Sequence, residues 1–179
     1  MCIRDRYLRQ DIIWHKPNPM PESVRDRCTK SHEYIFLFSN NRKYYYDNEA
    51  IKEPVKQDWG TRNRKNGKYH NAGTGLQPHS GLTKSYPTKN KRSVWSVTSK
   101  PYKGAHFAVF PPELIEPCIK AGSEKGDIIL DPFMGSGTTG MVAKQLGRDY
   151  IGCELIEEYG KLIQKRVTDY KVSIMDIIE

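Results

Sequence analysis

The stretch DIILDPFMGSGTTG, residues 127–140, leads from an apolar run into an acid, a proline and three glycines spaced as G-x-G-x-x-G. The apolar run predicts a buried strand over 126–131, and residues 136–147 are predicted to form a helix that Gly147 ends. A glycine loop between a strand and a helix is the setting that a phosphate or nucleotide site requires. The stretch therefore predicts a ligand site where a strand ends.

The residues that follow repeat the same alternation. DYIGCEL, residues 149–155, predicts a second strand, and EEYGKLIQKRV, residues 157–167, predicts a second helix. A β-α-β-α order implies parallel strands joined by helical crossovers, with the ligand at the carboxyl ends of the strands. The fold class predicted from this half of the chain is therefore α/β.

Upstream of the glycine loop, two strand-like runs occupy residues 9–16 and 32–40, and they are predicted to be neighbours in one sheet. Residues 112–122 predict a short helix that Gly122 ends, although Pro117 is an unfavourable residue in a helix interior. The chain thus offers a strand pair before the α/β part.

A basic region separates these two parts. Residues 55–103 hold eleven Lys or Arg and one acid, Asp58, within a chain whose net charge is +8. Such a run is often a solvated linker, and it has too few aliphatic residues to form a core of its own. Aromatic residues lie among the charges, however, and cations with aromatics suit phosphates and bases. We interpret the region as a surface that contacts nucleic acid, with Arg62, Arg64 and Lys65 as candidate phosphate contacts.

Composition excludes several classes of protein. No apolar run reaches the length of a membrane span, and no apolar stretch follows MCIRDR as in a signal peptide, so a cytoplasmic protein is predicted. The four cysteines form no C-x-x-C pair, and the five histidines make no ligand-spaced cluster with them. Neither disulfides nor a metal site are expected.

Three ligand classes fit a glycine loop in different degrees. Gly135, Gly137 and Gly140 match the dinucleotide pattern, and Glu154 lies near the spacing at which an acid meets ribose hydroxyls, so an NAD-type oxidoreductase is one hypothesis. A Walker A loop is excluded because no lysine follows Gly140. The acid Asp131 at the strand end disfavours a pyrophosphate and favours S-adenosylmethionine, which carries a sulfonium and an ammonium group.

The segments DPFMGSGTTG and DYIGCEL resemble the cofactor-binding part of the amino-methylating DNA methyltransferases of the N4-cytosine and N6-adenine type. HFAVFPPELIEPCIKAG, residues 106–122, resembles the motif that precedes the glycine loop in the circularly permuted members of that family. Residues 11–47 resemble the block that ends the family's catalytic half. The resemblance covers nearly the whole chain, except that the basic region corresponds in position only.

The resemblance implies a class I Rossmann-like fold of S-adenosylmethionine-dependent methyltransferases. Three segments follow from it: the end of the catalytic part at 1–54, a DNA-binding target-recognition region at 55–103, and the cofactor-binding part at 104–179. The glycine loop would wrap the methionine part of the cofactor, Asp131 would face its ammonium group and Glu154 would accept both ribose hydroxyls. The implied cofactor contacts are Phe110, Asp131, Phe133, Gly135, Ser136, Gly137, Thr138 and Glu154. Plain core packing is an equal alternative for Phe110 and Phe133. Trp14, Lys16 and Arg25 are expected on the DNA side, with surface or packing roles as the alternative for each.

One element of the family's pattern is absent from these 179 residues, the tetrapeptide [DNS]-P-P-[YFW]. In the family, its first side chain and a proline carbonyl accept hydrogen bonds from the target amine, and its aromatic ring stacks on the flipped base. The one Pro-Pro pair, Pro111-Pro112, has neither the polar residue before it nor the aromatic after it. We therefore interpret the chain as a C-terminal fragment with no catalytic residue of its own, inactive alone, and MCIRDR as a truncated or artefactual start. A non-enzymatic nucleic-acid-binding protein is the remaining alternative.

The resemblance also implies an incomplete sheet. In the family two central strands lie between the glycine-loop strand and the early strand pair, and both belong to the absent half. Strands 127–131 and 32–40 are therefore expected in separate pieces, roughly 14 Å apart, with unpaired edges and exposed apolar side chains. The implied partner is double-stranded DNA, while a cognate restriction endonuclease, the oligomeric state and the choice of adenine or cytosine are left open.

Overall fold

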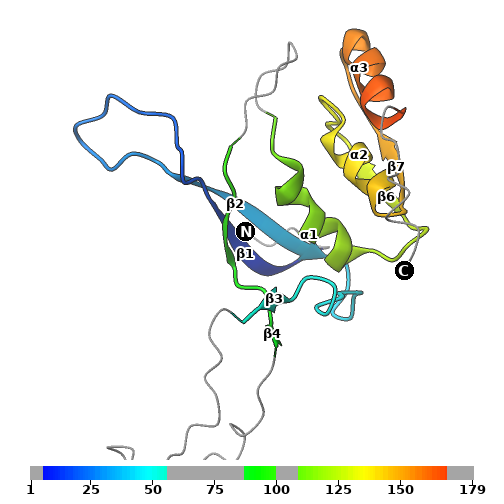
Figure 1. The fold of residues 1–179 in the computed structure, drawn as a ribbon, viewed down its shortest axis with the longest axis horizontal. Helices are drawn as coiled ribbons and strands as arrows, with labels where there is room; N and C mark the ends of the chain where they lie inside the picture. The colour runs from blue at the N-terminus through cyan, green and yellow to red at the C-terminus, as the bar shows by residue number, and fades with distance from the viewer. Residues whose placement is uncertain (1–5, 56–86, 100–108, 169–179) are drawn as a thin grey trace, which may run out of the picture. The chain divides into compact units, whose positions relative to one another are not determined.

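The computed structural model describes residues 6–55, 87–99 and 109–168 (Figure 1). The chain divides into two compact units, one formed by Met1–Ile51 with Arg92–Glu179 and the other by Lys52–Lys91. In the second unit the described residues form a two-stranded antiparallel ladder between β3 (Glu53–Pro54) and β4 (Thr88–Lys89). Arg62, Arg64 and Lys65 lie outside the described residues.

The first unit contains a three-stranded sheet in the order β2-β1-β5. Strand β1 (Tyr7–His15) pairs antiparallel with β2 (His32–Ser39), which confirms that the two early runs are neighbours. Strand β5 (Val94–Ser96) pairs parallel with β1 and was not predicted, because three residues between polar neighbours carry almost no periodic signal. Residues 92–99 therefore belong with the first unit, although the expected basic region extends to residue 103.

Alternation along β1 creates the first hydrophobic cluster. Ile12 and Trp14 lie two residues apart and point to the same face of the strand, where they pack with Trp95 of β5 and Leu114 of helix α1 (Pro112–Gly122). All four side chains are less than a tenth exposed. The sheet is therefore covered on this face by α1.

Helix α1 also belongs to the second cluster. Pro112 lies in its first turn, where a missing N–H costs little, and Pro117 does not end the helix, which continues to Gly122 as predicted. Ile119, near the other end of α1, packs with Val142 and Ala143 of helix α2. One helix thus contributes a buried side chain to each cluster.

The remaining elements confirm the predicted β-α-β-α order. Strand β6 (Ile128–Asp131), α2 (Thr138–Gln145), strand β7 (Asp149–Gly152) and helix α3 (Glu157–Thr168) follow one another, and β6 pairs parallel with β7. Helix α2 begins at Thr138 rather than at residue 136 because Gly137, with a φ of 81°, has a left-handed backbone. Gly147, also left-handed with a φ of 73°, follows its end as predicted.

The two strand groups remain separate sheets, as expected from the resemblance. Among the described residues, β2 pairs only with β1 and β6 pairs only with β7. Tyr34, Phe36 and Phe38 of β2 are exposed, and so are Ile128, Leu130 and Ile151 of the second sheet. The lack of ladder pairing and the exposed apolar side chains agree with the expectation, but both strand groups lie in one compact unit rather than in separate pieces. The spacing between the two sheets stays a prediction.

A membrane span is not among the elements observed: no helix within the described ranges is long and apolar enough to cross a bilayer.

Candidate cofactor-binding site

The glycine loop lies at the carboxyl end of β6 and is held against the end of β7. The N–H of Cys153 donates to the carbonyl of Asp131 at 2.9 Å, and the N–H of Met134 donates to the carbonyl of Cys153 at 2.9 Å. These two bonds extend the ladder beyond the pair Asp131 and Gly152. The loop is therefore fixed to both parallel strands where ligands of such sheets bind.

The three glycines have two different physical roles. Gly135 and Gly137 have left-handed backbones, with φ values of 52° and 81°. Residues other than glycine adopt this backbone conformation only with strain. Gly140 lies in helix α2, and a Cβ there would lie 2.4 Å from Cε of Met134 and 2.9 Å from the ring of Tyr150. The first two glycines shape the loop, and the third lets α2 approach the sheet.

A fourth glycine completes this packing. A Cβ at Gly152 of β7 would lie 2.8 Å from Cγ and Sδ of Met134. Met134 is buried, so its side chain occupies the space that Gly140 and Gly152 leave. Sequence reasoning missed Gly152, because one glycine at a strand end is equally typical of an ordinary turn.

Glu154 contacts the glycine loop directly. One of its carboxylate oxygens accepts the N–H of Gly135 at 2.8 Å, and the other accepts the N–H of Ile156 at 3.0 Å. A carboxylate has about four acceptor positions, which is more than these two bonds use. The structure thus brings together the glycine loop and the acid that the sequence assigned to one ligand.

Asp131 shapes the start of the same loop. Its Oδ1 accepts the N–H of Phe133 at 3.0 Å, which turns the chain away from the strand. The ring of Phe133 is 88% exposed, so it does not pack in the core and is open to a ligand or another chain. Phe110, in contrast, is half-buried against the first cluster, and its described contacts are those of a packing residue.

Ser136 and Thr138 lie buried where the loop enters α2. Arg166 of α3 donates from Nη1 to Ser136 Oγ at 2.8 Å and to the Ser136 carbonyl at 3.2 Å. Ile163, one helical turn before Arg166, lies 3.3 Å from the position of a Cβ on Gly137. Helix α3 therefore supports two successive loop residues from one face.

The charge beside Ser136, where the loop enters α2, favours binding of an anionic group. The guanidinium of Arg166 lies against Ser136, next to the N-terminus of α2, where unpaired N–H groups carry a partial positive charge. Sequence reasoning missed Arg166 because an arginine in a helix is usually a surface residue. A search for cations on the face of Ile163 would have found it.

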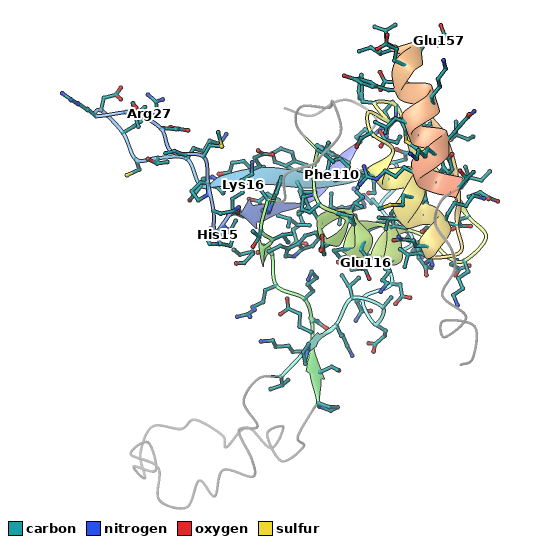
Figure 2. The ribbon with its side chains drawn as sticks, turned by 45° about the horizontal axis from the view of Figure 1, so that its top comes forward. His15, Lys16, Arg27, Phe110, Glu116 and Glu157 are labelled. Carbon is teal, nitrogen blue, oxygen red and sulfur yellow. The ribbon has the colours of Figure 1, made fainter. Side chains whose placement is uncertain are left out.

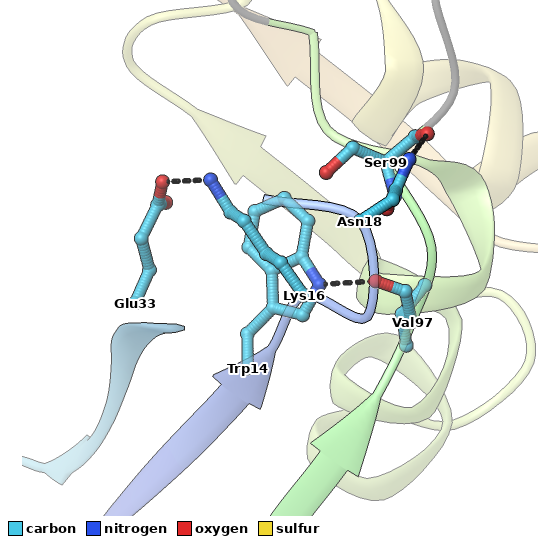
Figure 3. A network of polar contacts seen from close by, with 6 residues as sticks. All are labelled: Trp14, Lys16, Asn18, Glu33, Val97 and Ser99. Atoms are coloured by element: carbon cyan, nitrogen blue, oxygen red, sulfur yellow. Dashed lines mark hydrogen bonds and ion pairs between the residues drawn. The ribbon is translucent and has the colours of Figure 1, made fainter. Parts of the chain in front are cut away.

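Of the residues expected on the DNA side, Trp14 lies on β1, and Lys16 and Arg25 lie on the loop after it, where Figure 2 labels Lys16. Trp14 is 6% exposed, and its Nε1 donates to the carbonyl of Val97 at 2.8 Å (Figure 3). Trp14 therefore packs inside the first cluster, which is the alternative role that the sequence leaves open for it, and its expected DNA contact stays a prediction.

Lys16 rests on that buried ring. Its Nζ lies 4.4 Å from the ring centroid of Trp14 and forms an ion pair with Glu33 of β2 (Figure 3). Asn18, next along the loop, exchanges two 3.0 Å hydrogen bonds with the backbone of Ser99. Together they line a pocket of about 450 Å³ beside the exposed loop that carries Arg25.

No group of three His, Cys, Asp or Glu side chains able to hold a metal ion occurs within the described part of the chain.

Comparison with known families gives one consistent result. A sequence model described as DNA methylase, of the N6 and N4 type, matches residues 2–165. Type II methyltransferase M.SmaI of Serratia marcescens is 47% identical over 161 residues, which cover 90% of this chain and 46% of the relative. Type II methyltransferase M.XycI of Xanthomonas campestris pv. cyanopsidis is 44% identical over 171 residues, which cover 96% of this chain and 48% of the relative. The chain therefore spans about half the length of these relatives.

Solved structures agree on the fold. The cytosine-N4-specific PvuII DNA methyltransferase aligns with a TM-score of 0.63 at 20% identity, covering 96% of this chain and 55% of that one. TTHA0409 of Thermus thermophilus, complexed with S-adenosyl-L-methionine, aligns with a TM-score of 0.55 at 25% identity, covering 92% of this chain and 54% of that one. The Rossmann-like fold expected from the sequence is thereby confirmed.

Proposed function

Because the chain belongs to the DNA methylase family of the N6 and N4 type, we propose that it forms the cofactor-binding part of a site-specific DNA methyltransferase. The enzyme would transfer a methyl group from S-adenosylmethionine to the exocyclic amine of cytosine (N4) or adenine (N6). The observation that carries this proposal is the hydrogen bond between Glu154 and the N–H of Gly135, which joins the acid proposed to bind ribose to the glycine loop.

The residues present fit S-adenosylmethionine by their chemistry. Two left-handed glycines leave the loop backbone open to a close ligand, and the cation of Arg166 lies near Ser136. S-adenosylmethionine, when bound, supplies an electrophilic methyl group. Glu154 would accept the ribose hydroxyls, Asp131 would face the ammonium group, and the N-terminus of α2 with Arg166 would bind the carboxylate.

The part of the enzyme that this chain does not span would supply the acceptors for the target amine after base flipping, since the tetrapeptide is absent from these residues. The NAD-type alternative gains no support from the relatives, which are methyltransferases. Double-stranded DNA as substrate, a cytoplasmic location and a cognate restriction endonuclease belong to this proposal, because the relatives are type II methyltransferases.

Calorimetry of the 179-residue chain with S-adenosylmethionine, its demethylated product and NAD tests the cofactor assignment. We expect binding of the first two and none of NAD, since Asp131 would repel a pyrophosphate. Binding of NAD alone would overturn the assignment. If none of the three ligands binds and the fold is intact, the result would favour a non-enzymatic nucleic-acid-binding protein.

Replacing Arg166 by Ala should weaken S-adenosylmethionine binding about tenfold, because Ser136 loses its donor and the carboxylate loses a nearby cation. Arg166→Lys should recover part of this loss by retaining the charge. Lys165→Ala is the matched control, since Lys165 is the exposed neighbour on the same helix. Equal affinity in the Arg166→Ala and control proteins would show that the contact serves the fold alone.

Changing Arg62, Arg64 and Lys65 together to Ala should weaken DNA binding and flatten its dependence on salt. The slope of log K against log salt should fall by up to about 0.9 for each phosphate that is no longer neutralised. The measurement is a salt titration of binding to duplex DNA, with Lys125→Ala outside the basic region as control. If the triple variant has the same salt slope as the unchanged chain, phosphate contact by these three residues is refuted.

A further inference from the structure

Arg9 occupies an irregular position near the start of β1. The register between β1 and β2 shifts between the residues on either side of Arg9, so Arg9 is an extra residue on its strand, as in a β-bulge. Its Nε donates to Ser39 Oγ at 2.8 Å, and its Nη2 donates to the carbonyls of Asn41 and Arg42, each at 2.7 Å. Within the described part of the chain no acceptor is bonded to Nη1. The arginine therefore fixes the turn after β2 and keeps N–H groups available for an anion.

The same guanidinium group contacts two tyrosine rings. Its central carbon lies 5.0 Å from the ring centroid of Tyr7 and 4.8 Å from that of Tyr44. The rings of Tyr44 and Tyr46 lie 6.4 Å apart, centroid to centroid. Tyr7, Tyr44 and Tyr46 are 42%, 42% and 40% exposed, so rings that are held in place still reach the solvent. Side chains ordered in advance lose little conformational entropy when a ligand stacks on them.

The charge around these rings is positive. Arg42 and Lys43 are exposed, and neither forms an ion pair with an acid among the described residues. Residues 39–46, SNNRKYYY, contain no acid, and the carboxylate of Asp47 accepts two backbone N–H groups of the turn that follows. Partial burial raises the pKa of the Tyr46 hydroxyl, so this group carries no negative charge at neutral pH. An anion therefore meets no repulsion from this segment.

We call this feature the tyrosine–arginine surface, formed by Tyr7, Arg9, Arg42, Lys43, Tyr44 and Tyr46. It lies at the amino end of β1, whereas Lys16 and the expected DNA side follow the carboxyl end of that strand. The nine residues of β1, at about 3.3 Å each, place the two ends roughly 25–30 Å apart. The surface is therefore separate from the expected DNA side.

We propose that the tyrosine–arginine surface binds single-stranded nucleic acid, with unpaired bases stacked on Tyr7 and Tyr44 and phosphates beside the cations. Exposed aromatic rings among cations suit single strands, because every base has an apolar face that can stack on a ring. A duplex keeps its bases stacked inside the helix and offers these rings no base face. An acidic peptide would use the cations and leave the rings without a stacking partner. This inference goes beyond the proposed function, since it involves neither the cofactor nor methyl transfer.

The first test is fluorescence anisotropy of a labelled oligothymidylate of about twelve nucleotides, titrated with the 179-residue chain at physiological salt. Tyr44→Ala should weaken binding about tenfold, because a stacked base loses its ring. Tyr44→Phe keeps the ring and should bind as the unchanged chain does. Tyr34→Ala is the matched control, since Tyr34 is an exposed tyrosine of β2 outside the surface. Equal affinity in Tyr44→Ala and Tyr34→Ala would overturn the proposal, and circular dichroism verifies that each variant is folded.

The cations are tested at exposed positions, where removing a side chain leaves the packing intact. Changing Arg42 and Lys43 together to Ala should weaken binding and reduce the slope of log K against log salt by up to about 0.7 for each phosphate that is no longer neutralised. Changing Lys161 and Lys165 together to Ala removes the same charge from exposed positions of α3 and should keep the slope. Equal slopes in the two double variants would refute phosphate contact at the surface.

Photo-crosslinking distinguishes this surface from the basic region at 55–103. An oligonucleotide that carries bromodeoxyuridine is irradiated with the chain, and the cross-linked residues are identified by mass spectrometry. Cross-links at Tyr7, Tyr44 or Tyr46 support the proposal, and cross-links confined to residues 55–103 overturn it.

Two competitors test the class of partner. Duplex DNA should bind Tyr44→Ala as well as it binds the unchanged chain, and an equal loss for duplex and single strand would overturn the proposal. Poly-glutamate that displaces the oligonucleotide with equal affinity would also overturn it, in favour of an acidic protein. All measurements omit S-adenosylmethionine, so their failure leaves the proposed function untouched, and a failure of cofactor binding leaves this surface untouched.

Discussion

Glu154→Ala should reduce S-adenosylmethionine affinity roughly 100-fold or more while the chain stays folded. Each hydrogen bond to a charged group contributes about 1.5–3 kcal/mol, and the ribose hydroxyls would lose their acceptor together with the carboxylate that holds Gly135. Calorimetric titration measures the loss. Glu154→Gln keeps one oxygen acceptor, so its S-adenosylmethionine affinity should lie between those of the unchanged chain and of Glu154→Ala.

Glu158→Ala provides the control, because Glu158 is an exposed acid in the first turn of α3, a few residues further along the chain. It should bind the cofactor as the unchanged chain does. An unaltered affinity in Glu154→Ala would remove this residue from the site, and unfolding of that variant would show that its bonds to Gly135 and Ile156 serve the loop alone.

Gly140→Val should lower the free energy of unfolding by about 3 kcal/mol, at the upper end of what overpacking a core costs. A Cβ at this position would lie 2.4 Å from Cε of Met134 and within 3.0 Å of the ring of Tyr150, so α2 would have to move away from the sheet. Urea denaturation followed by circular dichroism measures the change.

Two further variants separate crowding from loss of glycine. A Cβ at Gly160 in α3 meets nothing within 4 Å, so Gly160→Ala should stabilise the chain by about 0.5–1 kcal/mol through helix propensity. Met134→Ala should offset part of the penalty of Gly140→Val, because it removes the atom that clashes. Additive effects in that double variant would contradict the packing described for Gly140.

The part of the fold that the sequence predicted is the part with strong local signals. The apolar run before Asp131, the glycine spacing and the stop at Gly147 predict strand, loop and helix within a few residues, and all three are observed. The prediction that this strand is buried was wrong, because Ile128 and Leu130 are exposed on one face of a two-stranded sheet. The position of Glu154 was predictable because parallel strands end at one edge, which brings the acid to the loop whatever lies elsewhere.

What the sequence did not reveal depends on tertiary contacts. Strand β5 exists because Trp95 packs beside Trp14, and neither residue carries a local sign of that pairing. The same contact explains why Trp14 is buried where a DNA contact was expected, since a tryptophan close to a lysine is equally typical of a surface site and of a core. Arg166 was missed because its partner Ser136 lies 30 residues away in the chain.

Helix α1 has a consequence for how the first unit melts. Leu114 anchors it in one cluster and Ile119 in the other, and the backbone after Ile119 is bonded from both sides. The N–H of Asp47 donates to the carbonyl of Ala121 at 2.9 Å, and Arg148 donates to the carbonyl of Ser123 at 2.8 Å. Loosening either cluster therefore frays the helix that the other cluster needs, so both sheets should lose their structure in a single cooperative transition although no strand joins them in the described residues.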